Sequence, residues 1–323
     1  MLDVEGLRTD YFVGSDNGGS GAVSAVRGLD LQVEAGTATA LVGESGSGKS
    51  TAALSIMRLI RPPIGDVVAG SVRLDGRDLL QLDAAGMRHV LLHDIGYIPQ
   101  DPTTALDPLF TVRSQIAEVI TDRTSKADTD ERIVELLNSL GVADAAHRLS
   151  SYPHEFSGGM RQRVAIAIAL AKDPGLLIAD EPTTALDVTT QIAILRLLDG
   201  LRQDRGLAML FVTHDLAVAR LVCQNVVVMY AGVVVESGPI DEVLDHPQHP
   251  YTQALLAAAP GQAAPRSRLR AIDGQPPALN RLPGGCPFAP RCPDVTDRCH
   301  DALPDPVTVG PSTTRCVLVG AGR

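Results

Sequence analysis

Residues 43–50 have the types and the order needed to bind a phosphate group. They read GESGSGKS and fit the pattern G-x-x-x-x-G-K-[ST] at every position. The uncharged, β-favouring run Thr37–Val42 precedes them, and Thr51–Ile60 has the composition of a helix. At such a junction backbone N–H groups and the helix dipole attract anions, and glycine permits close approach. The alternative, a flexible Gly/Ser loop, leaves the Lys-Ser pair at a helix start unexplained.

The side chains of this loop suit a nucleotide with its magnesium ion. Lys49 would reach the β- and γ-phosphates, and the Ser50 hydroxyl would ligate Mg²⁺. All residues of the loop and the one after it are candidate nucleotide contacts, namely Gly43, Glu44, Ser45, Gly46, Ser47, Gly48, Lys49, Ser50 and Thr51.

A pair of carboxylates follows a second apolar run. Asp180 and Glu181 come directly after Leu176–Ala179, and parallel sheets place their ligand groups at the carboxyl ends of such strands. Asp180 would support the Mg²⁺ shell through water, and Glu181 would polarise the water that attacks the γ-phosphate. The alternative is a solvated strand end, but the preceding phosphate loop favours the catalytic interpretation.

A second glycine-rich helix start lies at residues 157–159. Ser157 can cap the helix that follows, while Gly158 and Gly159 leave backbone N–H groups bare, which makes another anion site. One nucleotide needs only one phosphate loop, so two chains could enclose the nucleotide between them. An ordinary Ser-Gly-Gly helix cap is the alternative for this stretch taken alone.

The elements around these motifs indicate an α/β fold. Strand-like runs and helices alternate over residues 1–98 and 174–237, which predicts a largely parallel sheet covered on both faces. Residues from about 101 to 170 are mostly helical in pattern and would form a second lobe. Residues 260–283 are rich in proline, alanine and arginine and resemble a linker.

Length, composition and charge exclude several classes. The 323 residues suggest two domains, or one with an appendage, and the net charge of −10 argues against a general nucleic-acid binder. No apolar run reaches about 18 residues, so no membrane span is predicted. Met1–Glu5 is acidic where a secretory signal is basic. We expect the chain to stay in the cytoplasm and to work at a membrane only through a partner.

Four of the five cysteines lie close together near the end of the chain. In a cytoplasmic protein such a group favours metal binding over disulfides. Cys223 stands apart and is expected to be a small buried hydrophobic residue. The four grouped residues are Cys286, Cys292, Cys299 and Cys316.

Taken together, the motifs resemble those of the nucleotide-binding subunit of an ATP-binding cassette (ABC) transporter. The phosphate loop, the signature at Phe156–Met160 and the Walker B end at Asp180-Glu181 match in order and spacing over about residues 1–240. Gln100 matches the Q-loop, Ala185–Asp187 the D-loop and His214 the switch histidine.

The resemblance implies further roles. Gln100 would ligate Mg²⁺ and sense the membrane partner, and His214 would hold the γ-phosphate and orient the catalytic carboxylate. Asp187 would communicate across a dimer interface. Tyr11, or its neighbour Phe12, falls where the family stacks an aromatic ring on adenine, although either ring could equally belong to the core.

The later part of the chain resembles the oligopeptide/dipeptide importer branch of this family. The matching segments are Tyr152–Arg163, His249–Thr252 and Gly285–Pro293. In that branch four tail cysteines hold a [4Fe-4S] cluster, and the spacing here is C-x5-C-x6-C-x16-C. A structural zinc is the alternative, but it usually shows C-x2-C pairs that are absent here.

These expectations define one overall prediction. Residues 1–260 would form an ABC-type P-loop ATPase core with a helical subdomain, and 261–323 a small extension with the cysteines. The chain would power peptide import at the cytoplasmic face of the membrane, with a second homologous ATPase, two permease subunits and an external peptide-binding protein. The alternatives are a nickel importer, or a soluble ABC ATPase acting on nucleic acid or the ribosome.

Overall fold

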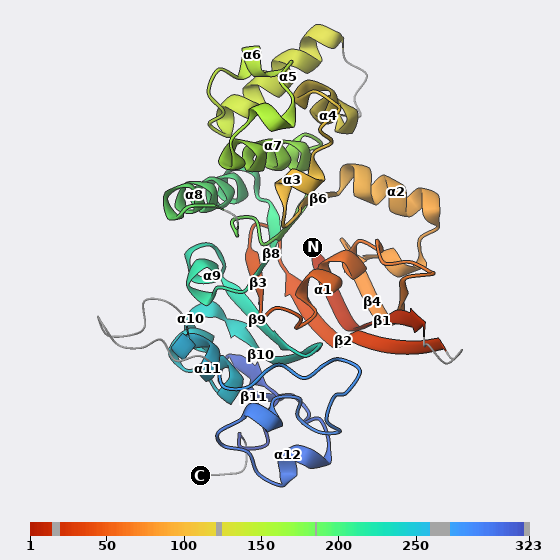
Figure 1. The fold of residues 1–323 in the computed structure, drawn as a ribbon, viewed down its shortest axis with the longest axis vertical. Helices are drawn as coiled ribbons and strands as arrows, with labels where there is room; N and C mark the ends of the chain where they lie inside the picture. Colours follow the sequence, from red (N-terminus) through yellow and green to blue (C-terminus); the bar gives the residue numbers. More distant parts are fainter. Residues whose placement is uncertain (15–19, 121–124, 185, 259–271, 320–323) are drawn as a thin grey trace. The chain divides into compact units, whose positions relative to one another are not determined.

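The computed structural model describes residues 1–14, 20–120, 125–184, 186–258 and 272–319 (Figure 1). The chain divides into two compact units. The first contains Met1–Glu34, Ala38–Gln81 and Phe211–Arg323, and the second contains Ala35–Thr37 and Leu82–Leu210. The predicted boundary at residue 260 and the first part of the predicted linker, 260–271, lie outside the described residues.

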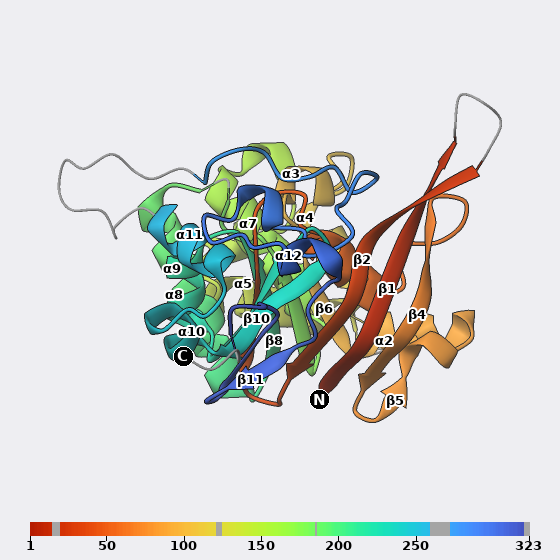
Figure 2. The same cartoon turned by 90° about the horizontal axis from the view of Figure 1, so that it is seen from below.

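The first unit begins with an antiparallel sheet in the order β2-β1-β4-β5, and its long strands run beside one another in Figure 2. Along β1, Leu2, Val4 and Leu7 are buried. The register of β1 shifts between Val4 and Leu7, which interrupts the two-residue period of buried side chains, and no strand was assigned there from the sequence. The strands are β1 Leu2–Gly14, β2 Ser20–Val33, β4 Gly65–Leu74 and β5 Arg77–Asp78, followed by the 3-10 turn η1 Leu79–Gln81.

A second sheet in this unit follows the order β11-β12-β10-β9-β3-β8. Strand β3 runs parallel to β9, whereas β10, β11 and β12 are joined antiparallel. These strands are β3 Ala38–Val42, β8 Ala208–Thr213, β9 Asn225–Tyr230, β10 Val233–Pro239, β11 Val307–Val309 and β12 Ser312–Thr314. The unit's helices and turns are α1 Lys49–Ile56, α9 Leu216–Val222, α10 Ile240–Asp245, α11 Pro250–Ala258, η3 Ala289–Arg291 and α12 Arg298–Asp301.

The second unit is mostly helical around three strands in the order β8-β7-β6, with β6 and β7 parallel. The first three residues of β8 belong to this unit and its last three to the first unit. The elements are α2 Ala84–His93, β6 Ile95–Ile98, α3 Pro102–Ala105, α4 Val112–Val119, α5 Lys126–Ser139, α6 Ala145–Arg148, η2 Pro153–Glu155, α7 Gly158–Leu170, β7 Leu176–Asp180 and α8 Val188–Arg205.

The buried strands confirm the predicted α/β class. Every residue of β3, β7 and β8 is buried, without the alternation that a half-exposed strand would show. The prediction of a largely parallel sheet was incomplete, because β1, β2, β4 and β5 form a separate antiparallel sheet. No helix among the described residues is long and apolar enough to cross a bilayer.

Truncating a leucine of β8 tests how much this buried strand contributes to stability. Leu210 is fully buried, whereas Leu221 on α9 is 65% exposed. We expect Leu210→Ala to cost about 2–5 kcal/mol of unfolding free energy because it leaves a cavity. Leu221→Ala is the matched control and should stay within about 0.5 kcal/mol. Urea denaturation of the two variants measures the difference, and equal shifts would contradict this account of the core.

Candidate functional site

The glycine-rich segment forms the turn between β3 and α1, as the sequence predicts. A Cβ atom on Gly43 would lie 2.2 Å from the Met229 carbonyl oxygen. Gly48 has φ +102°, and a Cβ there would lie 2.4 Å from the Ala25 carbonyl oxygen. Only glycine fits these two positions, because neighbouring backbone occupies the space of a side chain.

The lysine of the loop is folded back over the turn. The Lys49 ammonium donates to the carbonyl oxygens of Gly43, at 2.8 Å, and Glu44, at 3.0 Å. The buried hydroxyl of Ser47 makes no hydrogen bond in the structure. A buried hydroxyl without a partner normally indicates a missing ligand or water. The loop therefore has the donors expected of an anion site.

Two more predicted residues belong to this unit. The Tyr11 hydroxyl lies 3.4 Å from the Thr51 hydroxyl, at the start of α1. His214 is exposed and directly follows β8. The next residue, Asp215, caps α9 by accepting hydrogen bonds from the N–H groups of Ala217 and Val218. Adenine stacking by Tyr11 stays a prediction.

In the second unit, Asp180 ends β7 with a buried carboxylate. The Tyr97 hydroxyl, on the neighbouring strand β6, donates a hydrogen bond to it. Burial and then the charge of Asp180 raise the pKa of Tyr97 to about 12, so the hydroxyl keeps its proton and remains a donor. Tyr97 is not recognisable as a site residue in the sequence, because only the pairing of β6 with β7 brings it to the carboxylate.

Glu181 is held in an unusual backbone conformation. Its φ is +46°, a region that residues other than glycine rarely adopt and that costs about 1–3 kcal/mol. Its Oε2 accepts hydrogen bonds from Gln100 Nε2 at 3.2 Å and from the Thr184 hydroxyl at 2.8 Å. The structure thus brings together two predicted catalytic residues, Gln100 and Glu181, and adds Thr184.

The signature and the D-loop form a separate part of the second unit. Ser157 caps α7 by accepting from the Met160 N–H at 3.4 Å, and Asp187 caps α8 by accepting from Thr190. A Cβ on Gly159 would lie 2.8 Å from Thr190 Cγ2, so the two helix starts pack closely. A cavity of about 390 Å³ lies here, lined in part by Ser157, Gly158, Gly159, Asp187 and Thr190. Ala185 of the D-loop lies outside the described residues.

The predicted site residues are shared between the two units. The first unit carries the phosphate loop, Tyr11, His214 and the four tail cysteines. The second carries Gln100, Asp180, Glu181, the signature at 157–159 and Asp187.

The four tail cysteines are thiols that line one cavity, together with His249 and Phe288. Burial is the main cause that raises the pKa of Cys286, Cys292 and Cys316, for Cys292 to about 11. Across the described ranges, however, no group of three or more His, Cys, Asp or Glu side chains is arranged to hold a metal ion. Within those ranges the structure therefore shows no formed site for the predicted metal cluster, although its four candidate ligands line the same cavity. The isolated Cys223 is buried, as expected.

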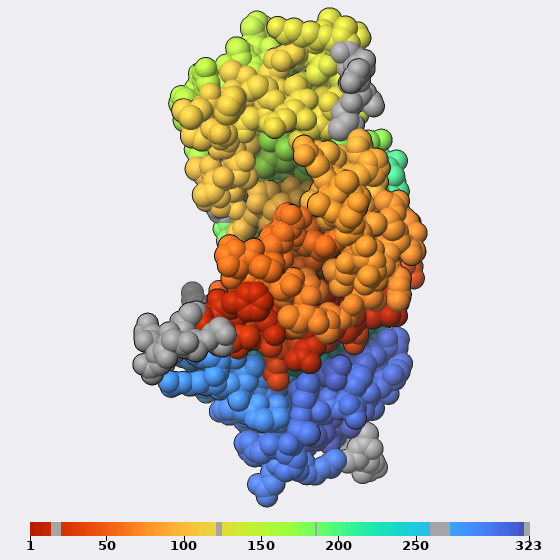
Figure 3. All heavy atoms as spheres, turned by 90° about the vertical axis from the view of Figure 1, so that its right-hand side faces the viewer, coloured from red at the N-terminus to blue at the C-terminus, as the bar shows by residue number. Residues whose placement is uncertain are grey.

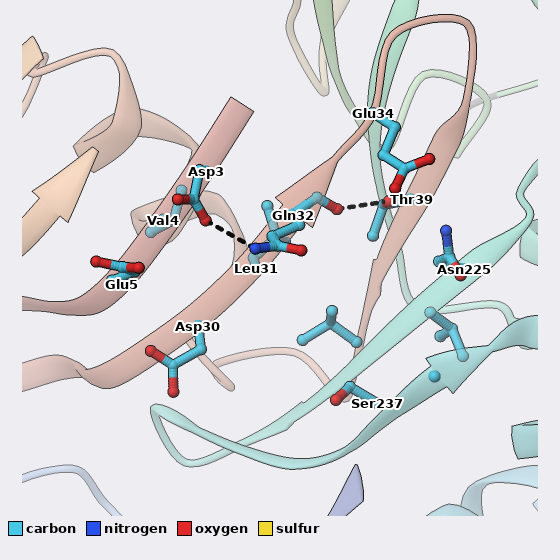
Figure 4. Close-up of a pocket in the computed structure, with 13 residues that line it drawn as sticks. Asp3, Val4, Glu5, Asp30, Leu31, Gln32, Glu34, Thr39, Asn225 and Ser237 are labelled. Atoms are coloured by element: carbon cyan, nitrogen blue, oxygen red, sulfur yellow. Dashed lines mark hydrogen bonds between the residues drawn. The ribbon is translucent and has the colours of Figure 1, made fainter. Parts of the chain in front are cut away.

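A different cavity of the first unit, of about 550 Å³, lies along β1, β2 and β9 (Figure 4). Gln32 Nε2 donates to Asp3 Oδ1 at 3.1 Å across two strands. The carboxylates around it are Asp3, Glu5, Asp30 and Glu34. It contains none of the predicted site residues, and its negative charge does not suit a nucleotide.

Comparison with known families identifies both parts of the chain. Residues 26–184 match the ABC transporter family, and residues 235–299 match the C-terminal region of oligopeptide/dipeptide transporters. The chain is 46% identical to a putative peptide import ATP-binding protein of Brucella ovis, over 98% of this chain and 96% of that protein. It is 41% identical to the oligopeptide transport ATP-binding protein AppD of Bacillus subtilis, with the same coverages.

Solved structures confirm the fold. The dimeric post-hydrolysis state of the ATP-binding cassette MJ0796, bound to ADP and Pi, is 28% identical with a TM-score of 0.66. The match covers 74% of this chain and 99% of that one. CbiO1 from Clostridium perfringens, part of the ABC transporter complex cbiONQ, gives 27% identity and a TM-score of 0.63, over 76% and 90% of the two chains.

The chain therefore belongs to the ABC transporter ATP-binding proteins, in the group that carries the oligopeptide/dipeptide transporter C-terminal region. Its enzymatic activity is that of an ATPase, with ATP and Mg²⁺ as its nucleotide and metal.

Replacing Gly48 tests the close approach in the phosphate loop. We expect Gly48→Ala to weaken ATP binding at least tenfold, because the new Cβ meets the Ala25 carbonyl oxygen and φ +102° is strained for alanine. Gly200→Ala is the control, since Gly200 lies in α8 with open space around it. Equilibrium titration with a fluorescent ATP analogue measures both variants. Unchanged affinity in Gly48→Ala would contradict the assignment.

Proposed function

We propose that this chain is the ATP-hydrolysing subunit that powers the import of peptides, from dipeptides to oligopeptides, through a membrane ABC transporter complex. The observation that carries this proposal is the similarity along nearly the whole chain to peptide import ATP-binding proteins, including the C-terminal region. The ATPase core alone would not select a cargo.

In the proposed reaction, the loop N–H groups and Lys49 bind the phosphates of ATP. Ser50, Gln100 and Asp180 would hold Mg²⁺, which supplies charge neutralisation at the phosphates when bound. A water oxygen attacks the γ-phosphorus and gives its proton to Glu181 while the bond to the ADP oxygen breaks.

The neighbours of Glu181 support its role in this reaction. Gln100 and Thr184 donate to Oε2 of Glu181, which orients the carboxylate. His214 would hold the γ-phosphate that leaves as phosphate.

The proposed assembly places one nucleotide between two ATPase subunits. The signature residues Ser157, Gly158 and Gly159 of one chain would meet the phosphates bound by the other, and Asp187 would connect the two sites. The start of α7 supports this role, because Gly158 and Gly159 carry no side chains there that would keep phosphate from the first N–H groups. The partners are a second, homologous ATPase, two transmembrane permease subunits and an external peptide-binding protein, so the chain would lie peripherally at the cytoplasmic face of the membrane.

The region from residue 261 onward is proposed to be an extension of the core at 1–260 that binds a [4Fe-4S] cluster, or alternatively zinc. Four thiols lining a single, mostly apolar cavity support this proposal, because thiolates are the ligands that both metals prefer. The cluster or zinc would cross-link, and so stabilise, a segment that has little hydrophobic core of its own.

Peptide uptake by cells lacking this gene tests the proposed function. We expect wild type to restore uptake of labelled peptides, and Glu181→Gln to bind ATP but hydrolyse it at least a hundredfold more slowly, without restoring uptake. Glu131→Gln, an exposed glutamate of α5, is the matched control and should behave as wild type.

The cargo outcomes separate the alternatives. If nickel uptake depends on the gene and peptide uptake does not, the proposed cargo is nickel and not peptide. If neither depends on the gene and the chain sediments with ribosomes or DNA, the transporter proposal is wrong. Normal ATPase activity in Glu181→Gln would show that Glu181 is not the group that accepts the proton of the attacking water.

The cysteine proposal has its own test. Chains purified without oxygen should contain iron and acid-labile sulfide, about four of each per chain. Cys292→Ser should lose both, whereas Cys223→Ala should retain them. Zinc in place of iron would favour the zinc alternative, and absence of both metals would contradict the proposal.

A further inference from the structure

The C-terminal region reaches the phosphate loop through one arginine. Arg291 Nη1 donates to Glu44 Oε2 at 2.6 Å, and Arg291 Nη2 donates to Glu44 Oε1 at 3.2 Å. Two parallel bonds between a guanidinium and a carboxylate are the strong, directional form of this pair. The arginine side chain is only 4% exposed and the glutamate 24%. Figure 3 shows C-terminal residues, in blue, against N-terminal residues of the same unit, in red.

The arginine is itself fixed in place. Its Nε donates to the Asp273 carbonyl oxygen at 2.9 Å, and its Nη2 to the Ile272 carbonyl oxygen at 3.2 Å. Its Nη1 also donates to the Tyr230 hydroxyl at 3.2 Å. The guanidinium therefore enters the pair with its orientation already set, and little side-chain entropy remains to be lost.

The main chain of Glu44 is held by a second residue from outside the loop. Its N–H donates to the Tyr251 hydroxyl at 2.8 Å. Tyr251 is fully buried and packs against Tyr230 and Phe288, with ring centroids 4.6 and 5.3 Å away. Burial raises the pKa of Tyr251, so its hydroxyl stays neutral and can accept this bond. Glu44 was predicted to contact nucleotide, but in the structure its N–H is hydrogen-bonded to Tyr251.

These contacts solve two problems of a loop that must bind a polyphosphate. A carboxylate at position 44 would repel the anion, and the adjacent guanidinium neutralises it. Three glycines make the loop costly to order, and fixing its second residue from outside lowers the entropy that nucleotide binding must supply.

We propose that Arg291 is a positioning residue of the ATP site, which neutralises Glu44 and, with Tyr251, holds the phosphate loop in its binding conformation. The C-terminal region then contributes directly to the affinity of the phosphate loop for ATP. The proposal rests on the ATPase activity and is independent of the cargo.

Affinity for ATP in the full-length chain tests the proposal. We expect Arg291→Gln to raise the Kd for MgATP at least tenfold, with kcat at saturating ATP within twofold of wild type. Arg291→Lys keeps the positive charge but cannot make the two parallel hydrogen bonds to Glu44. Its Kd for MgATP should lie between those of wild type and Arg291→Gln. Arg281→Gln, an exposed arginine of the same region, is the matched control and should leave the Kd unchanged.

A double variant separates positioning from simple attachment of the C-terminal region. Because Glu44→Gln removes the charge that Arg291 neutralises, combining it with Arg291→Gln should return the Kd to within threefold of the Glu44→Gln value. Additive losses in the double variant would overturn the proposal. So would a lower melting temperature of Arg291→Gln with an unchanged Kd. If Arg291→Gln does not fold, Arg291→Lys with and without Glu44→Gln gives the same comparison. A lack of peptide uptake would leave these Kd values standing, so the two proposals fail separately.

Discussion

The path of the phosphate loop depends on the absence of two side chains. Gly43 passes the Met229 carbonyl oxygen and Gly48 passes the Ala25 carbonyl oxygen at distances that no Cβ atom could tolerate. The elements that supply these neighbours, β2 and β9, must lie where they do for the loop to turn at all. This close fit fixes the turn that carries the buried Ser47 hydroxyl and lets the Lys49 ammonium reach the Gly43 carbonyl oxygen.

In the second unit, the adjacent carboxylates of Asp180 and Glu181 lie in different environments. Asp180 is buried and receives a hydrogen bond from Tyr97, whereas Glu181 occupies a strained backbone conformation and receives bonds from Gln100 and Thr184. Adjacent residues of one strand end therefore have different environments, one dry and one partly open. Such a difference suits two roles, a support for a metal shell and an acceptor of a proton.

The sequence predicted the motifs well because each is local. The phosphate-loop turn, the cap at Ser157 and the buried strand before Asp180 depend on neighbours within a few residues. Strand β1 was missed because the irregularity between Val4 and Leu7 interrupts the two-residue period of its buried side chains. The contact between Glu44 and Arg291 joins residues 247 positions apart, and no spacing rule in a single sequence reveals such a pair. The cysteines were seen as a group, but their arrangement depends on the folded tail.

The separation of Glu44 and Arg291 along the chain also matters during synthesis. A ribosome releases the phosphate loop early, together with β3 and α1, whereas the part of the first unit from residue 211 onward, which includes β9, follows only after the second unit. Tyr251 and Arg291 emerge only near the end of translation, after the whole of the second unit. A nascent or prematurely released chain thus displays an unrestrained loop with an uncompensated carboxylate. The contacts of Arg291 and Tyr251 with the loop therefore form last, so the full affinity for nucleotide proposed above is reached only when the chain is nearly complete.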